Sequence, residues 1–181
     1  MYYNKFLEDE NCNLIFNYLK QYTSQTYKKD TTYPWQENNS ILYQNIKNYD
    51  TKKLVRDSNI KLSISATLRY AVELYPNYSD LVLWNKGKSL SEHVDDDLIE
   101  YRNKIKIHNK LFWPRYISTF VYLNDDFEGG KIIVGEKEIT PKKGYALMFR
   151  SNIPHRVTEI TKGQRGVMAN WFTKDYSKFY L

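Results

Sequence analysis

Apolar residues near the start of the chain recur at the spacing of an α-helix. Between Glu8 and Tyr22 they fall three or four residues apart, at Cys12, Ile15, Phe16 and Leu19. This spacing puts them on one stripe of a helix, so we predict a helix here with the stripe turned inward.

A second helix is predicted from about Asp57, a residue type favoured at helix N-caps, to Tyr70. Its inward positions are expected to be Ile60, Ile64 and Leu68, with Leu62 as a further candidate. The segment between the two helices, residues 31–50, is polar and aromatic, and its pattern favours no single element.

From Leu81 onward the pattern changes to short apolar runs separated by turn residues such as Gly129-Gly130 and Lys162-Gly163. The predicted strands cover residues 81–84, 116–123, 131–134, 138–140, 145–149, 155–160 and 167–172. Many short strands at close spacing indicate an antiparallel sandwich or barrel. We therefore predict a mostly β, α+β chain with a single domain, residues 1–181. In it, helical support (residues 1–75) would buttress a β core (residues 76–175).

Residues 96–114 are the least regular part of the second half. This stretch is too long for a tight hairpin, and long excursions beside a site are often lids or binding loops. An ordinary surface insertion with a little helix fits the pattern equally well. Both interpretations stay open at this point.

Composition bounds the class of protein. A chain of 181 residues with 41% hydrophobic content can bury one substantial core, and no apolar run approaches the ~20 residues of a membrane helix. The first six residues lack the apolar core of a secretory signal. A lone cysteine, Cys12, excludes an intramolecular disulfide and favours a reducing compartment. We expect a cytoplasmic protein without a membrane partner.

The net charge of +6 invites comparison with nucleic-acid-binding proteins. The lysines are scattered, however, and acidic residues lie among them at Asp95-Asp96-Asp97 and Asp125-Asp126. A scattered excess of charge mainly aids solubility and weak non-specific attraction. Nucleic acid is therefore not the favoured partner.

A candidate metal site comes from two of the three histidines. His93 and Asp95 are two residues apart on a segment expected to be extended, so their side chains project to the same face. His155 follows Pro154, which pushes the preceding residue into an extended conformation, so His155 should begin a strand. Two imidazoles and one carboxylate on one side of a metal suit Fe(II) and leave positions open for substrates. The simpler alternative is a surface histidine and a solvated carboxylate, and His108 is interpreted as a plain surface residue.

Arg165 extends the candidate site. Its guanidinium can grip a carboxylate through two parallel hydrogen bonds. A diacid that chelates a metal at one end and meets Arg165 at the other would satisfy both charges. The alternative is a surface pair with Glu159, which would contribute little to stability.

Several segments, in order, resemble the Fe(II)- and 2-oxoglutarate-dependent dioxygenases, specifically the prolyl 4-hydroxylase and procollagen-lysyl hydroxylase branch. The resemblance covers residues 81–173. The segments are Trp84–Gly87 with Ser91–Asp95, Phe120–Asp125, Phe127–Gly130, Pro141–Phe149, Pro154-His155 and Thr161–Arg165.

The resemblance implies a double-stranded β-helix, a jelly roll of two antiparallel sheets, with iron near one open end. It implies that His93, Asp95 and His155 bind Fe(II). Arg165 would then hold the distal carboxylate of 2-oxoglutarate.

The resemblance also implies two further pocket residues. Tyr122 would hydrogen-bond the same carboxylate, with core packing as the alternative. Trp171 shares a predicted strand face with Arg165 and would line the pocket, with plain core again the alternative. One departure concerns Trp84 and Leu90, which stand where many relatives have tyrosines that orient the co-substrate.

The implied reaction is hydroxylation of a C–H bond, favoured on a prolyl or lysyl residue of a peptide or protein. It consumes O2 and 2-oxoglutarate, releases succinate and CO2, and uses ascorbate to keep the iron reduced. The alternatives are a small-metabolite or nucleic-acid-base oxygenase, a cupin-like metal enzyme independent of 2-oxoglutarate, and a jelly-roll binding module without catalysis. Arg165 argues against the cupin-like enzyme, and the complete ligand set argues against the binding module.

Overall fold

The computed structural model describes residues 1–25, 39–96, 99–102, 105–108 and 114–179. Two α-helices, fourteen strands and two 3-10 helices (η2, η3) alternate along this part of the chain. In order they are β1 (Tyr2–Lys5), α1 (Asp9–Gln25), β2 (Asn39–Leu42), η2 (Tyr43–Asn45), α2 (Tyr49–Tyr70), β3 (Tyr75–Asn85), β4 (Leu90–His93), β5 (Ile99–Arg102), β6 (Ile105–His108), β7 (Ile117–Tyr122), β8 (Glu128–Gly129), β9 (Ile132–Val134), β10 (Lys137–Ile139), β11 (Tyr145–Arg150), β12 (His155–Val157), β13 (Ile160–Lys162), β14 (Gln164–Thr173) and η3 (Tyr176–Lys178).

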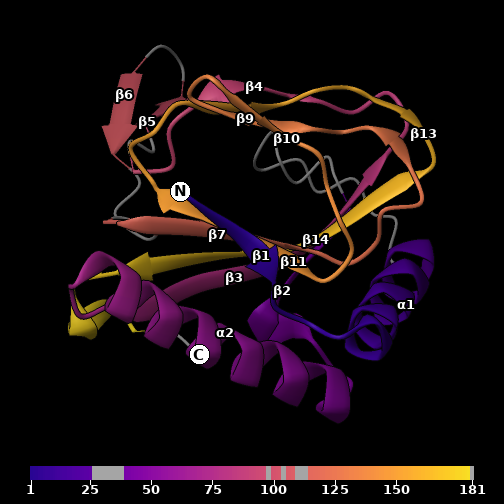
Figure 1. Ribbon diagram of the computed structural model, residues 1–181, viewed down its shortest axis with the longest axis horizontal. Helices are drawn as coiled ribbons and strands as arrows, with labels where there is room; N and C mark the ends of the chain where they lie inside the picture. Colours follow the sequence, from indigo (N-terminus) through magenta and orange to yellow (C-terminus); the bar gives the residue numbers. More distant parts are fainter. Residues whose placement is uncertain (26–38, 97–98, 103–104, 109–113, 180–181) are drawn as a thin grey trace.

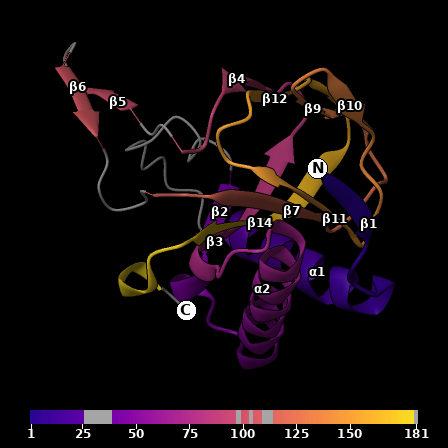
Figure 2. The same cartoon turned by 60° about the vertical axis from the view of Figure 1, so that its left-hand side comes forward.

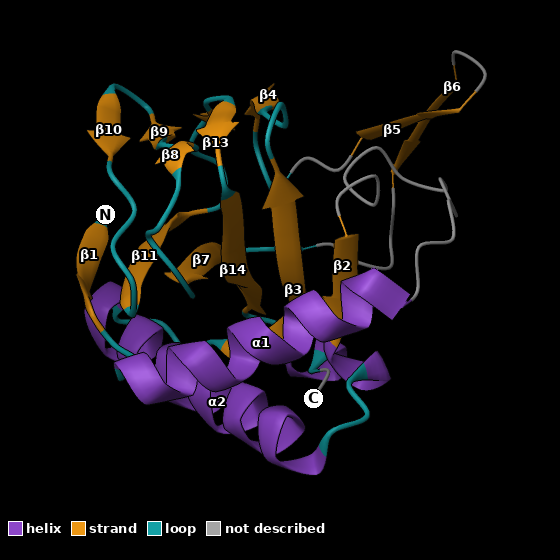
Figure 3. Cartoon of the chain, turned by 90° about the vertical axis from the view of Figure 1, so that its right-hand side faces the viewer, coloured by secondary structure: helices purple, strands orange, loops and turns teal. Residues whose placement is uncertain are grey.

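The strands form two facing antiparallel sheets with the helices outside (Figure 1). The main sheet has six strands in the order β1-β11-β7-β14-β3-β2, and the opposite sheet has four in the order β10-β9-β12-β4. Helices α1 and α2 cover the outer face of the main sheet (Figure 3). The β5–β6 hairpin projects away from both sheets (Figure 2).

Side chains of the main sheet alternate between two separate cores. On β3, Leu81 and Leu83 face the helices and pack with α1 residues such as Ile15. Val82 and Trp84 point the other way, into the space between the sheets. Because successive residues of a strand face opposite sides, one strand supplies both the helix-facing core and the interior where a site can form.

The first predicted helix is confirmed as α1, and its stripe of Cys12, Ile15, Phe16 and Leu19 is buried. The second helix begins earlier than predicted, at Tyr49 rather than near Asp57. Asn48 is its N-cap, accepting a hydrogen bond of 2.8 Å from the Thr51 backbone N–H. Asn48 lies in the segment whose pattern favoured no element, so its capping role was missed.

The predicted inward face of α2 is wrong for three of four residues. Leu62 is only 1% exposed, but Ile60, Ile64 and Leu68 are 39%, 55% and 79% exposed. The face turned to the protein carries Thr51, Val55, Ser58, Asn59, Leu62, Ser63 and Ala66. Small side chains dominate this face, so close fit to the neighbouring elements, and not apolar content, selected it. Nothing in the structure explains why three large apolar residues face outward.

Each predicted strand is present, with the segment 155–160 divided between β12 and β13. Strands β1 and β2 were not predicted, and they form the two edges of the main sheet. The N-terminal part is therefore more than helical support. Each of these strands has four residues and is held by its neighbour in the sheet, so local sequence carries little signal for it.

The irregular stretch 96–114 contains the β5–β6 hairpin, in which the backbone of His108 lies. Residues 97–98, 103–104 and 109–113, and the side chain of His108, lie outside the described residues. The choice between a lid and a surface insertion therefore stays a prediction. No helix in the described ranges is both long enough and apolar enough to cross a membrane.

Candidate metal centre

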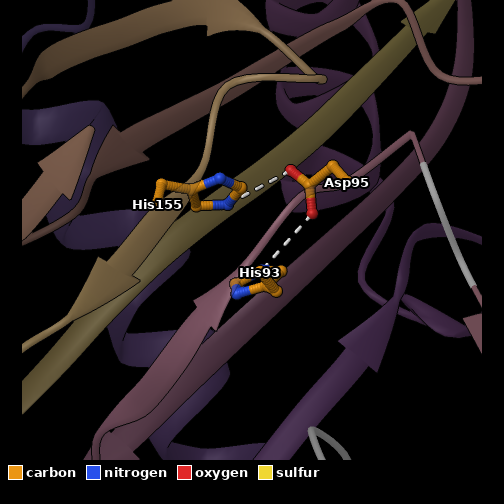
Figure 4. A group of neighbouring side chains, drawn as sticks. All are labelled: His93, Asp95 and His155. Atoms are coloured by element: carbon orange, nitrogen blue, oxygen red, sulfur yellow. Dashed lines mark ion pairs between the residues drawn. The ribbon is translucent and has the colours of Figure 1, made fainter. Parts of the chain in front are cut away.

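His93 and His155 occupy directly opposite positions on two paired strands. His93 ends β4, His155 begins β12, and the two are register partners with ring centroids 4.3 Å apart. Asp95 follows β4 at a bend that is held by a 2.8 Å hydrogen bond from its backbone N–H to the Ser151 carbonyl. One donor atom from each residue lies within 4.8 Å of the other two (Figure 4). The three residues predicted to bind metal therefore meet at one point.

Backbone contacts set the tautomer of both imidazoles. His93 Nδ1 is 2.9 Å from the Ser91 carbonyl oxygen, and His155 Nδ1 is 3.0 Å from that of Ile153. A carbonyl oxygen can only accept, so each Nδ1 carries a proton, and in the neutral imidazole Nε2 is then the nitrogen with the free lone pair. The Nε2 atoms lie 3.6 Å and 3.5 Å from the two oxygens of Asp95. His155 Nε2 is buried without a hydrogen-bond partner, as expected of an atom reserved for a ligand.

The Asp95 carboxylate is buried and contacted by side chains from β7, from the residues just before β7 and from β14. Ser118 Oγ and Trp171 Nε1 donate hydrogen bonds of 2.6 Å and 2.8 Å to Oδ2. An Arg115 guanidinium nitrogen lies 3.9 Å from Oδ1. Burial opposes the charge, but the contact with His93 and the charges of His155 and Arg115 hold the pKa of Asp95 far below its usual range. Asp95 is thus an ionised carboxylate at neutral pH.

The pKa values of the two histidines are shifted in opposite directions. Burial lowers the pKa of His93, but the contact with Asp95 outweighs it, and the net pKa is raised. Burial is the main cause of the lowered pKa of His155. A buried neutral imidazole beside an ionised carboxylate is the donor set that a divalent metal requires. The residues present therefore fit a metal ion, and the partial exposure of His93 leaves one side of the centre open.

Arg165 forms a second polar centre in the same interior. It is 2% exposed, lies on β14 directly opposite Trp84 of β3, and its guanidinium carbon is 5.2 Å from the Tyr122 ring centroid. Within the described ranges no carboxylate lies at ion-pair distance from it. The alternative of a surface pair with Glu159 is therefore wrong.

Three buried polar atoms around Arg165 lack a hydrogen-bond partner, namely Arg165 Nε, Tyr122 Oη and Trp84 Nε1. Burial raises the pKa of Tyr122, so its phenol stays protonated and can donate. Unpaired buried polar groups are unfavourable, and all three of these atoms can donate. An anion with several acceptor oxygens would satisfy them together. The indole N–H of Trp84 is thus one of the donors that such an anion would meet.

The turn before β9 contains two adjacent glycines, Gly129 and Gly130, because their neighbours leave little room for a Cβ. A Cβ on Gly130 would lie 3.0 Å from the Arg165 side chain, and one on Gly129 would clash with the Glu159 carbonyl oxygen. Both residues have positive φ. The pair lets the β8 turn pack closely against the stem of Arg165.

Sequence reasoning missed several residues around the metal centre. Trp171 was expected to line the pocket or to pack in the core, and its hydrogen bond to Asp95 was not foreseen. Ser118, which also contacts Ser151 Oγ at 2.9 Å, was not singled out. Its inward position on a predicted strand could have identified it. Arg115 had no such local signal.

Comparison with known proteins gives two sequence findings. The family model described as the 2OG-Fe(II) oxygenase superfamily matches residues 62–173. The chain is 43% identical over 93 residues to prolyl 3-hydroxylase 2 of Rattus norvegicus, covering 46% of this chain and 13% of that protein. It is 30% identical over 135 residues to prolyl 3-hydroxylase 1 of the same organism, covering 64% and 18%. The chain thus spans less than a quarter of the length of these curated relatives.

Solved structures with similar folds include two prolyl hydroxylases. One is the 2OG complex of a viral collagen prolyl hydroxylase from Paramecium Bursaria Chlorella virus-1, with TM-score 0.65, 16% identity and coverage of 95% of both chains. The other is a Pseudomonas putida prolyl-4-hydroxylase, with TM-score 0.67, 15% identity and coverage of 96% of this chain and 92% of that one. These likenesses confirm the predicted jelly-roll fold.

Proposed function

Since the chain belongs to the 2OG-Fe(II) oxygenase superfamily, we propose that it hydroxylates a prolyl residue of a peptide or protein. The proposal is carried by two polar groups that share the interior between the sheets. In the first group His93, Asp95 and His155 converge, and in the second the buried Arg165 lacks a carboxylate partner among the described residues. A divalent metal would fit the first group, and one carboxylate of a dicarboxylate would fit the second.

In this proposal His93, Asp95 and His155 hold Fe(II), and Arg165 with Tyr122 holds the distal carboxylate of 2-oxoglutarate. When bound, Fe(II) and 2-oxoglutarate would supply the oxidation by O2. 2-Oxoglutarate would be converted to succinate and CO2, and one oxygen atom would be delivered to a substrate C–H bond. The protein's own contribution is to bind, orient and exclude water. Trp171 and Ser118 orient the Asp95 carboxylate, while backbone carbonyls hold the Nδ1 proton of both imidazoles.

The open side of the metal centre supports a peptide substrate. Trp171, whose indole donates to Asp95, and Tyr78 are both partly exposed, with ring centroids 5.4 Å apart. Arg115 stacks on the Trp171 ring at 4.1 Å. Aromatic faces offer a flat apolar surface for a proline ring, and a guanidinium can donate to a peptide carbonyl. The relatives that are named as prolyl hydroxylases support the same substrate class.

Two further parts of the proposal concern the reductant of the iron and the compartment. Ascorbate as the reductant of the iron rests on the resemblance alone. A reducing, cytoplasmic setting rests on the single cysteine, Cys12, which is buried.

The test is coupled turnover by the protein loaded with Fe(II) and 2-oxoglutarate. Matched peptides that differ only in carrying proline, lysine or alanine at one position would be incubated with it. We expect succinate and the mass gain of one oxygen atom with the proline peptide, and loss of both in His155→Ala. Amino-acid analysis would then distinguish 3- from 4-hydroxyproline. Succinate without peptide oxidation would refute the substrate, and absence of succinate under all conditions would refute the enzyme class.

A further inference from the structure

Ser151 is a fully buried serine to which the proposed reaction assigns no role. It directly follows β11 and lies in a turn closed by a 3.0 Å hydrogen bond from the Ile153 backbone N–H to the Arg150 carbonyl. The backbone N–H of Ser151 donates to the Tyr116 carbonyl at 3.1 Å. Backbone hydrogen bonds therefore fix where Ser151 lies.

The turn that contains Ser151 contacts two of the three proposed metal ligands. The Ser151 carbonyl accepts a 2.8 Å hydrogen bond from the backbone N–H of Asp95 and a longer one, 3.3 Å, from that of Asp96. Two residues further on, the Ile153 carbonyl oxygen is 3.0 Å from His155 Nδ1. One short turn thus positions the backbone of one ligand and the ring of another.

The hydroxyl of Ser151 begins a chain of hydrogen bonds that ends on Asp95. Ser151 Oγ is 2.9 Å from Ser118 Oγ, and Ser118 Oγ donates a 2.6 Å hydrogen bond to Asp95 Oδ2. A hydroxyl has one proton to donate, and Ser118 gives its proton to the carboxylate. The bond between the serines must therefore run from the Ser151 O–H to Ser118 Oγ. Because both bonds point toward the carboxylate, each polarises and strengthens the other.

Burial makes the Ser151 hydroxyl hard to replace. Ser118 and Ser151 are both 0% exposed, and within the described ranges Ser118 is the one hydrogen-bond partner of the Ser151 hydroxyl. Without that hydroxyl the buried Ser118 oxygen would lose its donor, which is unfavourable. The bond from Ser118 to Asp95 would also lose the polarisation that Ser151 gives it.

We propose that Ser151 is a positioning residue for the metal centre, and that its hydroxyl acts on Asp95 through Ser118. Its carbonyl holds the backbone of Asp95 and its hydroxyl supports the side chain, so one residue orients both parts of the ligand. Trp171 donates to the same carboxylate oxygen without involving Ser151. Loss of the Ser151 hydroxyl should therefore weaken metal binding without abolishing it. This inference rests on the metal site of the proposed function.

The test uses a metal alone, so that it does not depend on turnover. Metal-free protein would be titrated with Mn(II) by calorimetry, without 2-oxoglutarate, for the wild type and Ser151→Ala. We expect roughly three- to tenfold weaker Mn(II) binding in the variant, no more than the loss of Ser118 itself would give. Ser63→Ala is the matched control, because Ser63 is a buried serine of α2 that donates to the Ile60 carbonyl. It should bind Mn(II) as the wild type does.

A double-mutant cycle separates action through Ser118 from an independent effect. The double variant Ser118→Ala/Ser151→Ala should bind Mn(II) as Ser118→Ala does, because no Ser118 hydroxyl is left to orient. Two independent effects would instead add. Should Ser151→Ala fail to fold, Ser151→Cys takes its place in the cycle, since a thiol keeps the shape of the side chain but is a weak donor.

The absorption spectrum of Co(II)-loaded protein gives a readout that a loss of stability would not move. The visible bands of Co(II) depend on the geometry of its ligands, so they should change in Ser151→Ala and stay unchanged in Ser63→Ala. The inference is overturned if Ser151→Ala has the Mn(II) affinity of the wild type, or if the losses from Ser118→Ala and Ser151→Ala add. Failure of the wild type to bind Mn(II) would instead refute the proposed metal site, so the two failures are distinguishable.

Discussion

The indole nitrogen of Trp171 donates a 2.8 Å hydrogen bond to Asp95 Oδ2, across 76 residues of sequence. This bond joins β14, the last strand along the chain and a member of the main sheet, to the bend after β4. Ser118 of β7 donates to the same oxygen, so two main-sheet strands hold one carboxylate that belongs to the opposite side of the sandwich. The orientation of Asp95 therefore depends on how the two sheets are packed.

Removing either donor should weaken metal binding. We expect Trp171→Phe and Ser118→Ala each to lower Mn(II) affinity by roughly tenfold, because Asp95 loses a partner that fixes its orientation. Ser79→Ala is the matched control, since Ser79 is also buried on the main sheet but bonds Asn170 on the helix-facing side. It should lose stability and keep its metal affinity. Equal Mn(II) affinities in Ser118→Ala and Ser79→Ala would contradict this account.

Arg165 should determine the affinity for 2-oxoglutarate and leave the affinity for the metal unchanged. In Arg165→Lys the planar fork is replaced by a point charge that cannot make two parallel hydrogen bonds to a carboxylate. We expect at least about tenfold weaker binding of 2-oxoglutarate to the Mn(II)-loaded protein without oxygen, with unchanged Mn(II) affinity. Arg156→Lys, on an exposed residue of β12, is the control. Wild-type affinity for 2-oxoglutarate in Arg165→Lys would remove Arg165 from the site.

The outward face of α2 gives a prediction about stability. Ile64→Lys should change the free energy of unfolding by no more than about 0.5 kcal/mol, because this side chain is largely exposed. Leu62→Ala, two residues earlier and buried, should cost about 2–5 kcal/mol. Urea denaturation of both variants measures the difference. A large loss in Ile64→Lys would mean that something covers this face.

Asp80 should make stability depend on pH. Burial raises its folded-state pKa to about 7, whereas an unfolded aspartate titrates near ~3.9. Between these values the folded state binds more protons, so the contribution of Asp80 to the free energy of unfolding is full below pH ~4, falls as the pH rises and levels off above ~7. The fall is on the order of a few kcal/mol.

Asp80→Asn cannot titrate and serves as the reference for this effect. The stability of the wild type relative to Asp80→Asn should therefore decrease from about pH 4 to about pH 7 in metal-free protein. His93 and His155 titrate in both proteins, so their contributions cancel in the difference. Urea denaturation across this range measures it. Parallel pH profiles for the two proteins would show that Asp80 does not titrate as argued.

Local sequence was sufficient to predict the strands and the grouping of His93, Asp95 and His155. The short apolar runs after Leu81 and their turn residues are local features, and each predicted strand is present. The spacing of His93 and Asp95, and the position of His155 directly after Pro154, likewise depend on neighbouring residues only. Backbone conformation follows from such neighbours, which is why these predictions succeeded.

Contacts between distant segments were decided by the tertiary structure alone. The sequence pattern favoured Ile60, Ile64 and Leu68 as the buried face of α2, but the fit of the helix to the sheet and α1 selected smaller residues.

The sequence by itself thus determined which residues can bind a metal and an anion, because residue type and local backbone are written in neighbouring positions. Only the tertiary structure decided that Trp171 and Ser118 hold Asp95, and that Arg115 lies beside the same carboxylate. These contacts join strands far apart in the chain, and they exist only when the sheets pack and bury charges that must then compensate one another.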